Sequence, residues 1–255
     1  MYRYFRIPVV LYGGVTPERA RAIEIVNQVN QSGTEQFILT STGRLLPQLL
    51  VETVKRFNDD TEIVRDAVSN IGSLLRYVSP RLKNDRDIVL AAVRNDGKAI
   101  LYASYRLQDD RLVNMIAVNQ DPQALENLFP EFRDDVEIVR AAVRKDGTAI
   151  KHASPRLQDV REVVLDAVSN KGRALFYASN RLRDNEPIVL AAVNQDASAL
   201  LYASDRLRDN KDIVLNAVRQ DGMTLEYASA RLRNDQFVVD AAVKENREAR
   251  TYAGW

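Results

Sequence analysis

The sequence predicts an all-α fold: an α-solenoid of eight 25-residue helical repeats, preceded by a small mixed α/β N-terminal cap. The phrase YASNRLRDNEPIVLAAV at residues 177–193 returns almost unchanged as YASDRLRDNKDIVLNAV at residues 202–218. A fixed period of this size is typical of solenoids, in which each unit buries its apolar face against its neighbours. An Ala-Val pair marks every repeat without insertion, beginning at Ala67, Ala92, Ala117, Ala142, Ala167, Ala192, Ala217 and Ala242.

Each repeat begins with a long helix. Apolar residues at 88, 89, 92 and 93 recur with the spacing of one helical face. A capping residue three positions before a carboxylate predicts the helix start, as in Asp59 with Glu62, Asn84 with Asp87, Asp134 with Glu137, Asp159 with Glu162 and Asp209 with Asp212. Glycine can adopt the left-handed conformation that ends helices. The sequence therefore predicts helix ends near Gly72, Gly97, Gly147, Gly172 and Gly222.

A second, shorter helix and a single turn complete the repeat. The short helix carries Ala99, Ile100 and Ala103. Because Ser79 precedes a proline, we expect this helix to end there and the serine to cap a further turn that holds Arg81-Leu82. The small residues let neighbouring helices approach closely, while the Val, Ile and Leu columns fill the core.

The phrases NDRDIVLAAVRNDGKAILYASYRL and DNKDIVLNAVRQDGMTLEYASARL resemble the short helical repeats of domain of unknown function 4116, over about residues 59–253. A looser similarity is to the leucine-rich repeat variant. The resemblance implies an all-helical repeat module and supplies no catalytic residues. It divides the chain into a capping domain, residues 1–58, and a solenoid, residues 59–255.

The two ends of the chain differ from the repeats. YFRIPVVLY and EQFILT have strand-like composition. TPERARAIEIVNQVN reads as a helix capped by Thr16 with Pro17 at its first position, and LPQLLVETVKRF reads as a second helix. In the last repeat Arg247 and Arg250 replace glycine and leucine, which suits a terminal repeat that faces water.

Composition narrows the possible functions. The 36 basic and 35 acidic residues balance almost completely, so no overall field attracts nucleic acid or an anionic membrane. No cysteine is present, and no apolar run is long enough for a signal peptide or a membrane span. HExxH, GxGxxG and P-loop motifs are also absent. We expect a cytoplasmic protein that is not an enzyme, with no cofactor, no membrane contact and no small-molecule substrate.

Two columns that vary together suggest a protein partner. In the fifth and sixth repeats both columns are apolar, pairing Leu165 with Phe176 and Leu190 with Leu201, and the first column continues to Leu215. If the two columns share one exposed face, these residues form a partner-binding patch. Burial of the columns beneath neighbouring repeats is the alternative. The function expected from the patch is protein–protein interaction or scaffolding.

Repeated tyrosines and arginines offer single-stranded nucleic-acid binding as the alternative function, by base stacking and phosphate contact. Packing of tyrosine between repeats, and pairing of arginine with the Asp and Asn residues nearby, is the favoured interpretation. His152 stands in the tyrosine column as a substitution. The columns are Tyr77, Tyr102, Tyr177, Tyr202, Tyr227 and Tyr252, and Arg81, Arg106, Arg156, Arg181, Arg206 and Arg231.

The third repeat departs from the pattern, with Asn114 in place of core valine and Pro122 in place of glycine. Neutral drift explains such changes, but a specialised contact is also consistent with them. Secondary candidates for partner binding are therefore Met115, Phe129 and Phe132.

Overall fold

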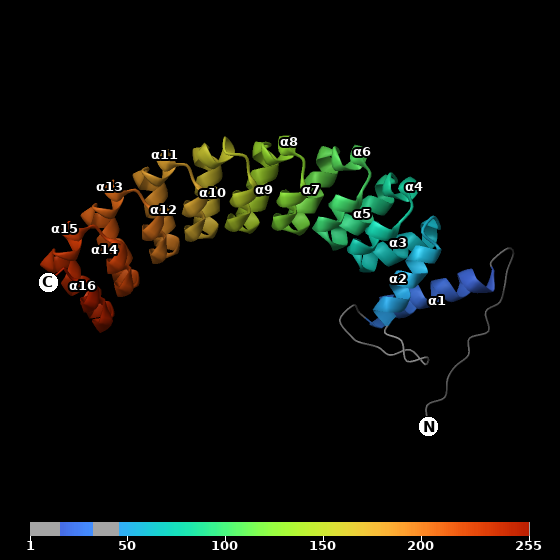
Figure 1. The fold of residues 1–255 in the computed structure, drawn as a ribbon, viewed down its shortest axis with the longest axis horizontal. Helices are drawn as coiled ribbons and strands as arrows, with labels where there is room; N and C mark the ends of the chain where they lie inside the picture. Colours follow the sequence, from blue (N-terminus) through green and yellow to red (C-terminus); the bar gives the residue numbers. More distant parts are fainter. Residues whose placement is uncertain (1–15, 33–45, 255) are drawn as a thin grey trace, which may run out of the picture. The chain divides into compact units, whose positions relative to one another are not determined.

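The computed structural model describes residues 16–32 and 46–254, and every regular element in these ranges is helical (Figure 1). The mixed α/β cap is not supported, because the described N-terminal part consists of two helices, α1 (Pro17–Ser32) and α2 (Leu46–Arg56). The segments expected to form strands lie outside the described residues. No described helix has the length and apolar character needed to cross a membrane.

The chain divides into two compact units, one up to Ile116 and one from Ala117. In the first unit, Thr16 caps α1 as predicted, since its Oγ1 accepts the backbone N–H of Arg19 at 3.2 Å. The Arg19 guanidinium lies 2.6 Å from Asp60 and 2.6 Å from Glu62, which joins α1 to the start of the first repeat helix. Both expected N-terminal helices are therefore present.

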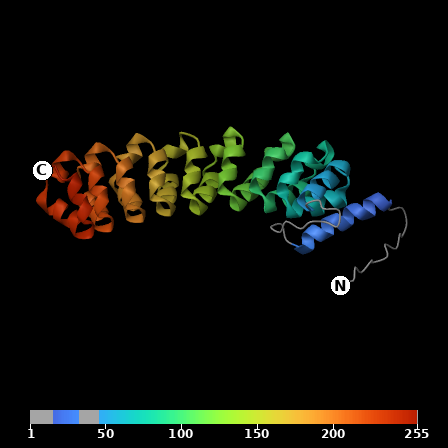
Figure 2. The same cartoon turned by 60° about the horizontal axis from the view of Figure 1, so that its bottom comes forward.

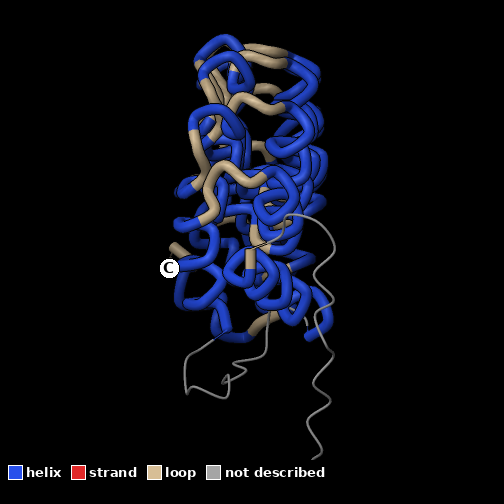
Figure 3. The backbone as a smooth tube through the Cα atoms, turned by 90° about the vertical axis from the view of Figure 1, so that its right-hand side faces the viewer, coloured by secondary structure: helices blue, strands red, loops and turns tan. Residues whose placement is uncertain are grey.

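A group of three helices recurs along the chain: a long α-helix, a six-residue 3-10 helix and, in nearly every group, a four-residue α-helix. Figure 3 shows these helices joined by short loops. The first unit holds α3 (Thr61–Asn70), η1 (Gly72–Tyr77), α4 (Pro80–Lys83), α5 (Arg86–Asn95), η2 (Gly97–Tyr102) and α6 (Tyr105–Gln108), and α7 (Arg111–Gln120) spans the division.

The second unit repeats this order, and its helices follow one another in a row in Figure 2. Its long helices stack side by side, with the short helices along the opposite edge (Figure 1). It holds η3 (Pro122–Asn127), α8 (Pro130–Arg133), α9 (Val136–Lys145), η4 (Gly147–His152), η5 (Leu157–Asp159), α10 (Arg161–Asn170), η6 (Gly172–Tyr177), α11 (Asn180–Arg183), α12 (Glu186–Gln195), η7 (Ala197–Tyr202), α13 (Asp205–Arg208), α14 (Lys211–Gln220), η8 (Gly222–Tyr227), α15 (Ala230–Arg233), α16 (Gln236–Glu245) and η9 (Arg247–Tyr252).

The core is built from the columns that the period predicts. In α12 the apolar residues at 188, 189, 192 and 193 are fully buried, and their equivalents in α5, α9 and α10 are too. Each such Val or Leu contributes roughly 1.5–3 kcal/mol when buried. Five of the four-residue helices add one buried leucine each, at Leu82, Leu107, Leu182, Leu207 and Leu232.

The helix caps lie one residue later than predicted. Asp85, not Asn84, caps α5, because its side chain accepts the N–H groups of Asp87 and Ile88 at 3.0 and 3.2 Å. Asp60, Asp135 and Asn210 do the same for α3, α9 and α14. The residues predicted as caps make different contacts, described below.

The glycine column lets neighbouring repeats approach each other closely. The long helices end before these residues, and none of Gly72, Gly147, Gly172 and Gly222 has a left-handed φ, so the predicted conformation is wrong for them. A Cβ added at Gly147 would lie 2.2 Å from the carbonyl oxygen of Ala167 in the next repeat. Glycine is therefore required where one repeat's 3-10 helix meets the backbone of the next.

Candidate functional site

The arginine column is engaged in a ladder between successive repeats. In α13, Arg206 donates from Nε to Oδ1 of Asp184 at 3.0 Å and from Nη2 to the Asp184 carbonyl oxygen at 2.7 Å. The Ser204 hydroxyl donates to the same carboxylate. The predicted pairing is confirmed, and these contacts recur at Arg81 with Asp59, Arg156 with Asp134, Arg181 with Asp159 and Arg231 with Asp209, while Arg106 uses the neutral Asn84.

These contacts predict acid sensitivity. Hydrogen bonds from Ser204 and Arg206 hold the pKa of Asp184 below its ordinary value, and the pKa of Asp209 is lowered in the same way by Ser229 and Arg231. A carboxylate whose folded pKa is depressed stabilises the fold above its unfolded pKa, and this contribution is lost as pH falls through the folded pKa. The melting temperature, followed by circular dichroism, is therefore expected to fall on acidification below the normal titration range of aspartate.

The comparison variant is Asp184→Asn with Asp209→Asn, which copies the neutral arrangement that Asn84 already forms with Arg106. It is expected to melt at a slightly lower temperature at neutral pH and to lose less stability in acid. An acid profile unchanged from the wild type would show that the ladder does not set the acid dependence.

The tyrosine column is half-buried between successive 3-10 helices. Tyr202 meets the ring of Phe176 edge-on at 5.3 Å between centroids, and Phe176 meets Tyr177 at 5.0 Å. His152 is also half-buried, with Nε2 3.2 Å from Oε1 of Gln123. These contacts favour packing between repeats over a free ladder of stacking faces.

Four of the five predicted partner residues are exposed. Leu165 and Leu190 lie on α10 and α12, whereas Phe176 and Leu201 lie on η6 and η7. Phe176 is the most open of them, with 54% of its surface exposed. These four side chains are therefore accessible to a partner, as the partner hypothesis requires.

The structure places these residues on two different kinds of helix, and a single shared face is not supported. The long helix α10 packs against η6 through the buried sides of both. Leu165 and Phe176 stand on the opposite, exposed sides of those helices. We call Leu165 and Leu190 the long-helix surface, and Phe176 and Leu201 the 3-10 surface.

Leu215 is not part of either surface, because only 8% of it is exposed. Lys211, one turn earlier on α14, lies 5.3 Å from the ring of Phe237 on α16. Since residues four apart share a helix face, we attribute the burial of Leu215 to this neighbouring ring.

One of the three secondary candidates is a core residue. Phe132 is buried at the position that leucine fills in other short helices, so it belongs to the core. Met115 and Phe129 are half-buried. Asn114 is fully buried; its Nδ2 donates to the Gln108 carbonyl oxygen at 2.8 Å, whereas its Oδ1 is buried without a hydrogen-bond partner.

A groove of about 290 Å³ adjoins the 3-10 surface at Leu201, and we call it the arginine groove. Two guanidiniums, those of Arg183 and Arg208, face it from the last positions of α11 and α13. Sequence reasoning missed this second arginine column, whose signal was arginine at 133, 183, 208 and 233. The lining residues are Asn180, Arg183, Leu201, Ala203, Ser204, Asp205 and Arg208.

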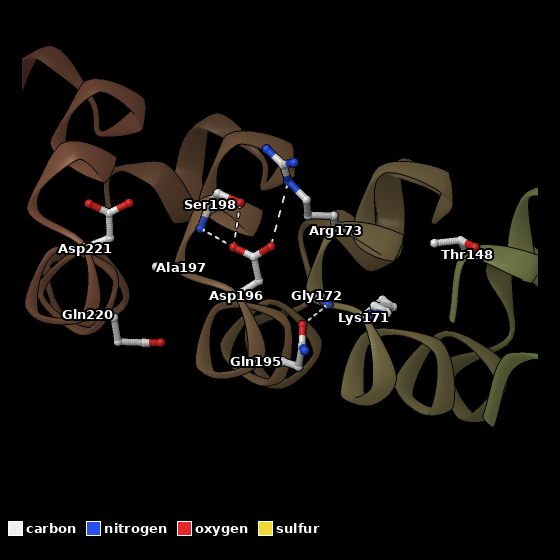
Figure 4. A pocket seen from close by; sticks show the side chains of 10 residues that line it. All are labelled: Thr148, Lys171, Gly172, Arg173, Gln195, Asp196, Ala197, Ser198, Gln220 and Asp221. Atoms are coloured by element: carbon white, nitrogen blue, oxygen red, sulfur yellow. Dashed lines mark hydrogen bonds and ion pairs between the residues drawn. The ribbon is translucent and has the colours of Figure 1, made fainter. Parts of the chain in front are cut away.

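A larger groove of about 460 Å³ lies where the long helices meet the 3-10 helices, and Figure 4 shows the side chains that line it. Asp196 accepts from the N–H and hydroxyl of Ser198 at 2.9 and 2.6 Å, and Arg173 approaches it at 3.8 Å. Gln195 accepts the N–H of Gly172. These polar groups are largely used in ending helices and joining repeats.

Ala197 explains where this groove opens. It stands in the glycine column, and α12 packs less closely on α14 than on α10. Four other repeats have a glycine at this position where an added Cβ would overlap the backbone of the next repeat, so the methyl group of Ala197 separates the neighbouring backbones. Among the described residues, no group of three or more His, Asp or Glu is placed to hold a metal ion.

The stacked groups of helices define a tandem α-helical repeat protein. Four consecutive segments, residues 60–108, 110–158, 161–208 and 210–255, match the family described as Domain of unknown function (DUF4116), and the chain belongs to this family. Each matched segment spans two Ala-Val pairs, so the family unit corresponds to a pair of repeats. No curated protein and no solved structure matches the chain.

Proposed function

We propose that the chain is a non-enzymatic protein-binding module, an array of eight 25-residue repeats that presents a partner surface in its fifth and sixth repeats. The observation that carries the proposal is the grouping of exposed large apolar side chains. Eight large apolar side chains are exposed among the described residues, and four of them, Leu165, Phe176, Leu190 and Leu201, fall in these two consecutive repeats. Grouped exposed apolar side chains mark interaction sites more often than single ones do. Location in the cytoplasm stays a prediction from the sequence.

The 3-10 surface is the better contact surface of the two. Phe176 is held by edge-on contact with Tyr177 and Tyr202, so little side-chain freedom is lost when a partner covers it. Aromatic anchors of this kind dominate the energy of many interfaces. We therefore place the centre of the interface at Phe176 and Leu201.

Nucleic-acid binding is the weaker alternative. The ladder arginines already donate to aspartates, which leaves less of their charge for phosphate. Phosphate contacts also make affinity fall steeply with salt, whereas apolar contact does not. Measuring the complex over a range of salt separates the two functions.

The test compares the two surfaces. A partner is first identified by crosslinking and mass spectrometry from native extract and then purified, and its affinity is measured by calorimetry. Phe176→Glu with Leu201→Glu is expected to weaken binding at least tenfold, roughly the cost of removing a central anchor. Leu165→Asp with Leu190→Asp reports on the long-helix surface.

Lys151→Glu with Glu226→Lys is the matched control, because these residues occupy the same column as Phe176 and Leu201, in the repeats on either side, and are polar in the wild type. Circular dichroism confirms that each variant is folded. Unchanged affinity in both apolar double variants would refute the proposed surface.

A further inference from the structure

We propose that the arginine groove binds the carboxylates of an extended acidic segment of the partner, whose apolar side chain packs on Leu201 and Phe176. This inference rests on the proposed function and names the chemistry of the ligand. Both arginines and Leu201 line one groove beside the 3-10 surface, so charge recognition and apolar contact are available to the same ligand. Arginine suits carboxylates because its planar fork can donate two parallel hydrogen bonds.

The guanidiniums of the groove are less committed than those of the ladder. Arg206 donates from two nitrogens to Asp184. Arg183 donates only from Nε, to the Tyr202 carbonyl oxygen at 2.6 Å, and pairs with no carboxylate among the described residues. Arg208 pairs only with Asp205, and its Nε is buried without a hydrogen-bond partner. Donor groups therefore remain for a ligand.

The ion pair of Arg208 is easily exchanged. Asp205 is three residues away on the same short helix, and 92% of its side chain is exposed. Exposed pairs of this kind contribute little to stability, because water competes for both charges. A ligand carboxylate can replace Asp205 at small cost.

The other repeats show that arginine at this position is not needed for folding. The equivalent Gln108 donates to the carbonyl oxygens of Leu101 and Ala103, and Gln158 donates to those of Ile150 and Ala153. Glutamine thus meets the internal hydrogen-bonding requirement. The positive charge at Arg183 and Arg208 is additional to it.

The spacing of the two arginines defines the ligand. They occupy equivalent positions in stacked repeats, and packed helices lie about 8–10 Å apart. A chain in the polyproline II conformation advances about 3.1 Å per residue with about three residues per turn, so carboxylates three residues apart lie on one side of it, about 9 Å apart, and can reach both guanidiniums. The two side chains between them point to the other sides of this chain, so an apolar one can pack on Leu201.

A polypeptide fits better than a nucleic acid. Leu201 and Ala203 give the groove an apolar wall, which suits the side chains of a peptide and has no counterpart in a phosphate backbone. A single-stranded oligonucleotide is therefore the competing ligand in the test.

The experiment measures fluorescence anisotropy of short labelled peptides with the full chain. The probe has glutamates about three residues apart with leucine between them; one control has the same composition with adjacent glutamates, and another has lysines in place of glutamates. Arg183→Gln with Arg208→Gln, which copies Gln108 and Gln158, is expected to weaken probe binding at least tenfold, roughly the effect of losing a charged contact. Arg219→Gln, exposed on α14, is the matched control and should bind as the wild type does.

Equal binding of the probe to all three proteins, or equal binding of the lysine peptide, overturns the inference. So does an oligonucleotide that binds more tightly than the probe and is lost in the double Gln variant, which would make the groove a phosphate site. If the native partner is lost with Phe176→Glu and Leu201→Glu but not with the double Gln variant, the proposed function holds and the acidic ligand fails. If neither of these variants loses the partner, and Leu165→Asp with Leu190→Asp does not lose it either, both fail.

Discussion

Replacing Val193 with aspartate is expected to unfold α12 and the helices that pack on it. Val193 is completely buried, between repeats whose long helices stack side by side. An unpaired carboxylate there must either lose its hydration or take up a proton, and both are costly in an apolar core. We expect a loss of more than about 4 kcal/mol in the free energy of unfolding.

Hydrogen exchange measured by mass spectrometry locates the effect. In a repeat array each unit is stabilised by its immediate neighbours, so protection should fall most in α12, then in α10 and α14. Asn194→Asp is the matched control, because the same charge is added at the next residue, which is exposed. Similar exchange in the two variants would mean that Val193 does not belong to a packed core.

The period and the apolar spacing were enough to predict the core, but not the caps. Most long helices are preceded by two residues that can both cap, such as Asn84 and Asp85. Local rules do not choose between them. The choice is made by a tertiary contact, because the first residue of each pair receives the arginine of the following repeat, as Asn84 receives Arg106.

The candidate surface, like the helix caps, could be predicted from the sequence only in part. The sequence identified side chains that are free of the core, such as Leu165 and Phe176, because their columns tolerate both charged and apolar residues. It did not separate them into two surfaces, since that depends on which sides of α10 and η6 face each other. It also did not distinguish Arg181, which binds Asp159, from Arg183, which faces the groove.

Substitutions at Gly147 test why glycine is required between repeats. A Cβ there would lie 2.2 Å from the Ala167 carbonyl oxygen and 3.1 Å from Cβ of Lys171, so the two repeats must move apart to accept it. Gly147→Ala is expected to lower the free energy of unfolding by about 1–3 kcal/mol, the usual cost of overpacking. Gly147→Asn should cost more, because a larger side chain needs more room.

The order of the two variants is decisive, and urea unfolding followed by circular dichroism measures it. A left-handed glycine would give the reverse order, since asparagine tolerates that conformation better than alanine does. If Gly147 were under neither constraint, Gly147→Ala would raise the free energy of unfolding by about 0.4–1 kcal/mol, because alanine lowers the entropy of the unfolded chain. Only close approach between repeats predicts that both variants lose stability and that asparagine loses more.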